Sequence, residues 1–247
     1  MSRTVAKAVI AINELADGPR PLSALAEAVG VHASTALRML QPLVDAGMIT
    51  RGSDGKYRLG LRMAEFGQQV LDDLDLRAVA RGHLLPLAES TGATVHLAQL
   101  IDGTIVYVDK IEGAAKVRTW SRVGRPVPLH TSAVSKAILA RFDAAAVGEI
   151  VDTCDFTRFT PATVTSREEF SAELARTAER GYATDFGEFE PLVHCVGVAV
   201  PDTAPAVDAA VSVTTVQAEP DFDALRGLVP RLTATAAAIA DDLGHRD

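Results

Sequence analysis

The chain is poor in cysteine, in aromatic residues and in long apolar runs, and each shortage excludes a class of protein. Its 247 residues include only Cys154 and Cys195 as cysteines, which can form neither the disulfide framework of a small secreted domain nor a four-cysteine zinc site. Two cysteines are typical of a protein kept in a reducing compartment. No apolar stretch reaches the roughly 18 uncharged residues that a membrane helix needs. We therefore expect a cytoplasmic protein without a membrane partner.

What is present is the composition of an ordinary globular protein, with 48% hydrophobic and 23% charged residues, 18 glycines and 12 prolines. A chain of this length removes about 70–75% of its unfolded surface from water, so its core needs no disulfide or metal. The first residues carry charges inside their apolar run, which is not the pattern of a signal peptide. We expect one large or two small domains.

Charge is distributed unevenly along the chain. Residues 1–60 hold seven Lys and Arg against five Asp and Glu, a net charge of +2. The rest of the chain holds 17 basic and 27 acidic residues, a net charge of −10, and the whole chain carries −8. Such an asymmetry indicates a nucleic-acid-binding arm on a body that does not bind nucleic acid. An excess of +2 is small, so this indication needs support from the sequence pattern.

Residues 1–60 have the pattern of a winged helix-turn-helix domain. Helices are predicted over residues 4–16, 22–30 and 33–46, with Ser23 capping the second, and two short strands around Ser53-Asp54-Gly55 form a hairpin. In this arrangement the start of the third helix enters the major groove while the hairpin reaches the flanking phosphates. The expected DNA-binding residues are Ser34, Thr35 and Arg38 on the helix and Arg51, Lys56 and Arg58 on the hairpin. An inert helical bundle and a protein-binding winged helix are the two alternatives.

The remaining residues are expected to form a linker helix and an α+β domain. Residues 61–75 are amphipathic, and their apolar side must be buried on their own domain or in a dimer. From residue 76 to residue 247, helices and alternating strands predict a central antiparallel sheet with helices on one side, as in small-molecule sensor domains. Within it we expect a helix broken or kinked near Pro86, a short strand at 117–120 and one closing helix over 221–244.

Three segments, in this order and spacing, resemble the isocitrate lyase regulator (IclR) family of bacterial transcription factors over almost the whole chain. LSALAEAVGVHASTALRMLQPLVDAGMI followed by YRLG is similar to the winged helix of that family. PLHTSAVSKAILA resembles its pattern P-x-H-A-x-x-x-G-K-A-x-L-A, and RGYATDFGEFEPLVHCVGVAV resembles R-G-Y-A-x-D-x-E-E-x-x-x-G-V-x-C-I-A. The resemblance implies a regulator, more often a repressor, that binds an inverted-repeat operator as a dimer or a dimer of dimers.

The resemblance also implies a GAF-like domain that binds a small metabolite, such as a carboxylic acid, an aromatic acid or a sugar-derived compound. Ser212 and Thr214 lie two residues apart on one strand, so both hydroxyl groups face the same side. Trp120 is expected to form an aromatic wall. The residues that the resemblance places in the pocket are Ala133, Val134, Asp185, Cys195, Ser212 and Thr214.

The chain departs from the family pattern at three positions. Ser135 and Leu192 each replace a glycine, and Gly187 replaces the first glutamate of a pair. The replacements of glycine by larger residues are expected to reduce the volume of the pocket and the freedom of the backbone. They bear on which metabolite binds more than on the fold.

Catalytic motifs are absent: the sequence has no G-x-S-x-G, P-loop, G-x-G-x-x-G or H-E-x-x-H. His194 and Cys195 are neighbours on a predicted strand and so point to opposite faces, which excludes a Cys–His dyad between them. We expect no enzyme activity, no catalytic residue, no cofactor and no metal ligand. The alternative to a metabolite sensor is a metal- or redox-responsive DNA-binding switch that uses Cys195.

Overall fold

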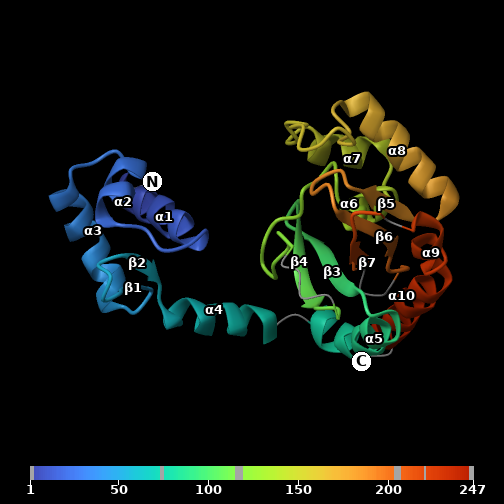
Figure 1. Ribbon diagram of the computed structural model, residues 1–247, viewed down its shortest axis with the longest axis horizontal. Helices are drawn as coiled ribbons and strands as arrows, with labels where there is room; N and C mark the ends of the chain where they lie inside the picture. The colour runs from blue at the N-terminus through green and yellow to red at the C-terminus, as the bar shows by residue number, and fades with distance from the viewer. Residues whose placement is uncertain (1–2, 73–74, 115–118, 203–206, 220, 245–247) are drawn as a thin grey trace. The chain divides into compact units, whose positions relative to one another are not determined.

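The computed structural model describes residues 3–72, 75–114, 119–202, 207–219 and 221–244 (Figure 1). The chain divides into two compact units, residues 1–73 and residues 74–247, called unit 1 and unit 2 below. The predicted limits of 60 and 75 for the winged helix and the linker stay predictions.

Unit 1 has the helices and the hairpin that the sequence predicts. Its elements are α1 (Arg3–Ala16), α2 (Leu22–Ala28), α3 (Ala33–Asp45), β1 (Ile49–Arg51), β2 (Tyr57–Leu59) and α4 (Leu61–Asp72). The two strands are antiparallel, with Thr50 opposite Arg58. Leu15, Leu25 and Leu40, one from each of the first three helices, are buried in a shared core. This core fixes the angle at which α3 presents its outer face.

One local prediction in unit 1 is wrong. Ser23 does not cap α2, because the helix already begins at Leu22 and Pro21 is the residue before it, without a side-chain cap. Proline suits this boundary since its fixed φ and missing N–H cost nothing at a helix start. At α3 the boundary residue is His32, which is exposed and also makes no side-chain cap.

Unit 2 is an α+β domain around one antiparallel sheet, as predicted. Its elements are α5 (Asp75–Thr91), β3 (Thr94–Ile101), β4 (Thr104–Ile111), α6 (Ala133–Leu139), α7 (Ala144–Val151), α8 (Arg167–Arg180), β5 (Ala183–Phe186), β6 (Val193–Ala199), β7 (Ala209–Val216), α9 (Phe222–Arg226) and α10 (Val229–Gly244). The sheet order is β4-β3-β7-β6-β5. Every neighbouring pair is antiparallel.

Helices cover both faces of this sheet, so the prediction of helices on one side is wrong. α5 and α10 pack on one face, and α6 packs on the other with α8 against it (Figure 1). Strand β7 shows the reason: Val211 and Val213 belong to the core under α5 and α10, whereas Ala210 belongs to the core under α6. Ser212 and Thr214 alternate with these valines and are buried on the α6 side. Both faces of the strand are therefore buried.

Other local predictions also differ from the structure. α5 is not broken at Pro86 but continues from Asp75 to Thr91, packed against β3, β4 and α10. The closing segment forms two helices: α9 ends at Arg226, and α10 begins at Val229. The four-residue strand β5 was not anticipated, since it is too short for a clear alternation. Of the predicted strand 117–120, residues 117–118 lie outside the described residues, and 119–120 are not in a strand.

Candidate functional site

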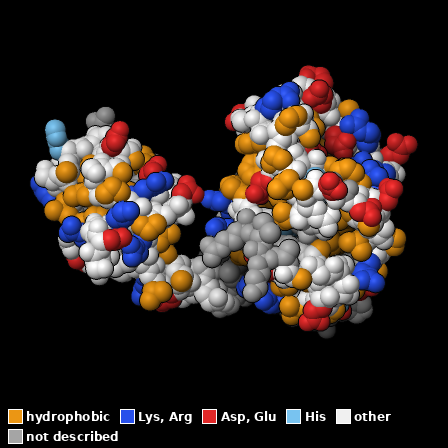
Figure 2. Space-filling model, viewed as in Figure 1, with side chains coloured by type: hydrophobic (Ala, Val, Ile, Leu, Met, Phe, Trp, Pro, Cys, Tyr) orange, Lys and Arg blue, Asp and Glu red, His pale blue; other side chains and the backbone are white. Residues whose placement is uncertain are grey.

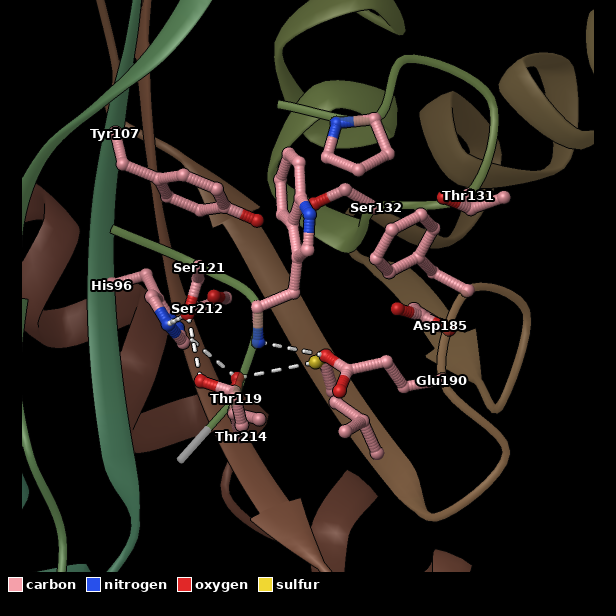
Figure 3. A pocket seen from close by; sticks show the side chains of 15 residues that line it. His96, Tyr107, Thr119, Ser121, Thr131, Ser132, Asp185, Glu190, Ser212 and Thr214 are labelled. Carbon is pink, nitrogen blue, oxygen red and sulfur yellow. Dashed lines mark hydrogen bonds between the residues drawn. The ribbon is translucent and has the colours of Figure 1, made fainter. Parts of the chain in front are cut away.

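A small pocket lies on the α6 face of the sheet in unit 2 (Figure 3). Its floor comes from β3, β4, β6 and β7, and its walls come from the segments before α6 and between β5 and β6. The cavity has a volume of about 40 Å³. The lining residues are His96, Tyr107, Thr119, Trp120, Ser121, Pro128, Thr131, Ser132, Asp185, Phe189, Glu190, Val193, Cys195, Ser212 and Thr214.

The structure brings together five of the seven predicted pocket residues. These five are Trp120, Asp185, Cys195, Ser212 and Thr214. The other two, Ala133 and Val134, are buried in α6 and do not line the pocket. Ala133 lies against Gly197 of β6, where a Cβ atom would come within 3.1 Å of the Ala133 backbone. Ala133 and Gly197 therefore set how closely α6 approaches the sheet.

A chain of hydrogen bonds crosses the pocket floor. The Nδ1 atom of His96 lies 3.2 Å from Oγ1 of Thr214, which in turn lies 3.1 Å from Sγ of Cys195. On its other side, Nε2 of His96 lies 2.8 Å from Oγ of Ser121. Burial, together with the nearby positive charge of Lys110, lowers the pKa of His96 to about 3. The imidazole is thus neutral at physiological pH and acts as a polar, uncharged group.

The carboxyl groups of the pocket lie on the side of β5 and of the segment that follows it. Asp185 is buried, and its Oδ1 accepts a hydrogen bond of 2.9 Å from the N–H of Glu188. Glu190 accepts one of 3.1 Å from the N–H of Trp120 through Oε2. Burial, with the negative charge of Glu188 as the next cause, raises the pKa of Asp185 to about 7. This pocket therefore contains a carboxyl group that is half protonated near neutral pH.

A buried ion pair holds the segment between β5 and β6, which carries Glu190, against α6. Nζ of Lys136, on α6, donates to Oε1 of Glu188 at 2.5 Å and to the carbonyl of Thr184 at 2.9 Å. The hydroxyl groups of Thr160 and Thr163 donate to the carbonyls of residues 187 and 188. β5 and the segment after it are thus bonded to α6 and to the segment between α7 and α8.

Aromatic rings form the remaining wall. The rings of Trp120 and Phe189 meet edge to face with centroids 5.1 Å apart, and Phe189 meets Phe159 in the same way at 4.6 Å. The guanidinium of Arg125 lies over the indole of Trp120, 4.3 Å from its centroid. Trp120 thus forms part of an aromatic wall, whose other members the sequence did not reveal.

Sequence reasoning missed most of the lining, including His96, Tyr107, Thr119, Phe189 and Glu190. For His96 a signal existed: once β3 is paired with β7, this residue stands directly opposite Ser212. The other four lie in loops or on β4, and their approach to the pocket depends on how distant segments meet.

The two larger residues that stand where the family pattern has glycine do not take up pocket volume directly. Ser135 and Leu192 do not line the pocket. The hydroxyl of Ser135 donates to the backbone carbonyls of Leu129 and Ser132, and Leu192 is half exposed. Gly187 has a φ of +77°, and a Cβ there would lie 2.9 Å from a backbone oxygen. A glycine at this turn removes that strain.

The six predicted DNA-binding residues lie on α3 and on the β1–β2 hairpin of unit 1. Ser34, Thr35 and Arg38 are exposed in the first turns of α3. Arg51 and Lys56 are exposed on the hairpin, and Figure 2 shows Lys and Arg side chains on the surface of this unit. The sixth predicted residue, Arg58, is half-buried and forms an ion pair of 2.9 Å with Asp54.

The described part of the chain offers neither a membrane span nor a metal site. None of its helices combines the length and hydropathy that crossing a bilayer takes. Its His, Cys, Asp and Glu side chains form no group of three or more that could hold a metal ion. His194 and Cys195 lie on opposite faces of β6: Cys195 faces the pocket, and the ring of His194 meets Phe186 and Phe222.

A helix-turn-helix unit joined to an α+β unit with a small polar pocket defines a class of ligand-responsive DNA-binding proteins. Family comparisons agree: the model described as "Bacterial transcriptional regulator IclR C-terminal" matches residues 68–241. The model described as "IclR helix-turn-helix domain" matches residues 4–53. The chain belongs to the IclR family of DNA-binding transcriptional regulators, as its sequence motifs predict.

Individual relatives cover nearly the whole chain. The transcriptional regulator XynR of Escherichia coli is 36% identical over 222 residues, which are 90% of this chain and 88% of that protein. The crystal structure of Thermotoga maritima IclR has 30% identity and a TM-score of 0.79, covering 99% of this chain and 100% of that one. A Microbacterium hydrocarbonoxydans IclR homologue complexed with 4-hydroxybenzoate has 25% identity and a TM-score of 0.79, covering 97% and 98%.

Proposed function

We propose that this protein is a metabolite-controlled repressor, not an enzyme, that works in the cytoplasm where operator DNA lies. The observation that carries the proposal is the pairing of two features: an exposed helix start in unit 1 and a small pocket with aromatic and polar lining in unit 2. The first suits the major groove of DNA. The second suits a small ligand, because it has an aromatic wall and a few convergent polar groups.

DNA binding is assigned to the start of α3 and to the hairpin. Ser34, Thr35 and Arg38 are exposed on the part of α3 that enters the major groove in helix-turn-helix proteins. The cations Arg51, Lys56 and Arg58 of the hairpin contact phosphates beside it. We infer a dimer or a dimer of dimers, with α4 as the linker that brings two copies of α3 together. Its operator is then an inverted repeat.

The effector is assigned to the class of carboxylic or aromatic acids. The rings of Trp120, Tyr107 and Phe189 form an apolar surface for a planar ligand, and the hydroxyl groups of Ser212 and Thr214 face the same space. The homologue that was crystallised with 4-hydroxybenzoate supports this class. An effector that prefers one of two subunit arrangements by about 1–3 kcal/mol changes DNA occupancy 5- to 150-fold.

The experiment separates the two modules. Fluorescence-labelled DNA from the region upstream of the gene is titrated with the wild type and with Arg38→Ala, and effector binding is measured by calorimetry. We expect Arg38→Ala to weaken DNA binding at least tenfold, a cost of about 1.4 kcal/mol, and to leave effector binding unchanged. Arg226→Ala, an exposed arginine of unit 2, is the control. Equal losses of DNA and effector binding would contradict separate modules.

The rival, a redox or metal switch at Cys195, has less support. Burial raises the pKa of the Cys195 thiol well above its usual range, whereas oxidation and metal binding need the thiolate. Cys154 is more accessible. We expect a thiol reagent to label Cys154 faster than Cys195 in the folded protein, as peptide mass spectrometry would show. DNA binding that is lost on oxidation in the wild type but retained in Cys195→Ser would support the rival.

A further inference from the structure

The pocket poses an electrostatic problem for an acidic effector. Two carboxyl groups, those of Asp185 and Glu190, line it, and its described lining residues include no lysine or arginine. Negative charges close to a ligand carboxylate disfavour its binding in the ionised form. Two carboxyl groups can nevertheless lie side by side when they share one proton.

We propose that Asp185 is the specificity-determining residue of this pocket: it selects a monocarboxylate by donating a hydrogen bond to it from a protonated carboxyl group. The inference rests on the proposed effector function and deepens it. Binding takes up one proton from the solvent wherever Asp185 is ionised beforehand, and no covalent bond forms or breaks. The carboxyl group of Asp185 and the ligand carboxylate then hold a single negative charge between them.

The geometry around Asp185 suits a donor. The residue lies on β5, and Figure 3 shows its carboxyl group directed into the pocket. Its Oδ1 already accepts the N–H of Glu188 at 2.9 Å, so the other oxygen is the better site for the proton.

A second lining residue, Thr131, has a hydroxyl group that a ligand can bind. Thr131 is completely buried, and its hydroxyl oxygen has no hydrogen-bond partner among the described residues. A buried hydroxyl without a hydrogen-bond partner destabilises the fold, and a ligand oxygen would supply that partner. Thr131 lines the same pocket as Asp185. A carboxylate has two oxygens and can accept from both groups.

The charges near Asp185 set its protonation. Burial is the largest cause of its raised pKa of about 7, and the negative charges of Glu188 and Glu190 raise it further. The positive charge of Lys136 and the N–H of Glu188 act in the opposite direction. Each of these two effects is smaller than the effect of burial.

Three other titratable groups that line the pocket have pKa values shifted away from neutral pH. Burial raises the pKa values of Cys195 on β6 and of Tyr107 on β4, and it lowers that of His96 on β3 to about 3. From α8, Glu173 faces Arg180 in an ion pair of 2.7 Å. Among the described lining residues with a shifted pKa, the aspartate is therefore the one that changes charge near pH 7.

The test is calorimetry on the full-length protein with acetate, benzoate and 4-hydroxybenzoate as probes. Each is titrated at pH 6, 7 and 8, in two buffers of different ionisation enthalpy, which yields the number of protons taken up. With a pKa of about 7 for Asp185, we expect affinity to fall about tenfold from pH 6 to pH 8. Proton uptake should approach one per site at pH 8. Benzamide should show no proton uptake, and the dianion of 1,4-benzenedicarboxylic acid should bind at least tenfold more weakly than benzoate.

Variants assign the proton. Asp185→Asn keeps the shape and an N–H donor, so we expect it to bind the acids with no pH dependence and no proton uptake. Glu179→Gln, which removes an exposed carboxyl group of α8, should behave as the wild type. If Asp185→Asn does not fold, proton uptake by the wild type decides the question together with a carbon-13 NMR titration of its aspartate carboxyl groups, which should show one with a midpoint near 7.

The outcomes separate the inference from the function on which it rests. Acid binding without proton uptake, or pH dependence that persists in Asp185→Asn, overturns the inference and leaves the proposed effector class intact. A wild type without an aspartate midpoint near 7 also overturns it. Failure of all three acids to bind the folded wild type at pH 6 overturns both.

Discussion

The Nζ atom of Lys136 is fully buried and lies 2.5 Å from Oε1 of Glu188. This ion pair joins α6 to the segment between β5 and β6, which supplies Phe189 and Glu190 to the pocket wall. The pair thus connects the core of unit 2 to its candidate binding site. Buried pairs of this kind are sensitive to the loss of either member.

Removing the lysine alone should destabilise unit 2 strongly. Lys136→Met leaves the Glu188 carboxylate buried without its partner, which costs about 3–5 kcal/mol of the free energy of unfolding. The double variant Lys136→Met, Glu188→Met should recover most of that loss, because two apolar groups of similar volume fill the site. Urea unfolding measures both. The control is Arg167→Met, which breaks an exposed pair with Asp152 and should cost less than about 1 kcal/mol.

The hairpin cations should differ in their contribution to DNA binding. Arg58 is held by Asp54, whereas the Nε of Arg51 donates to a backbone carbonyl that carries no net charge. We expect Arg51→Ala to reduce the slope of log affinity against log salt by about 1, and Arg58→Ala to reduce it less. Asp54→Ala should tighten binding. Fluorescence anisotropy over a range of salt concentrations checks all three, and an equal effect of the two arginines would contradict the role given to Asp54.

The hydroxyl pair on β7 should be needed for effector binding. Ser212→Ala, Thr214→Val removes both groups from the pocket floor, so an acid that raises the melting temperature of the wild type should raise that of this variant less. Thr215→Val is the matched control, since Thr215 points to the other face of the strand. Thermal-shift assays decide. An unchanged ligand-induced shift in the double variant would exclude these residues from the site.

Stability should depend on pH through Asp185. Its pKa rises from 3.8 to about 7 on folding, so the folded state binds more protons between these values and stability falls as pH rises through that range. Asp185→Asn does not ionise. We therefore expect this variant to gain melting temperature relative to the wild type at pH 8 and to gain less at pH 5. The same difference at both pH values would show that the carboxyl group has an ordinary pKa.

Local sequence patterns predicted the elements of unit 1 well. The apolar spacing of α1 and α3, the glycine after α2 and the turn residues of the hairpin are each decided within a few positions of the chain. Charge asymmetry and the position of Arg38 near the start of α3 then indicated DNA binding. The family resemblance placed Asp185 and Cys195 ten residues apart, and the structure brings them together as directly paired residues of β5 and β6.

The sequence by itself determined the α+β class, the helix-turn-helix, the family and the alternation that turns Ser212 and Thr214 to one side of β7. Only the tertiary structure decided that helices cover both faces of the sheet and that His96 stands opposite Ser212. It also decided that Ala133 packs on Gly197 instead of lining the pocket. The physical reason is that alternation and helical spacing depend on residues close in sequence. The pairing of strands and the burial of charges such as Lys136 depend on segments that are distant in sequence and meet only in the folded chain.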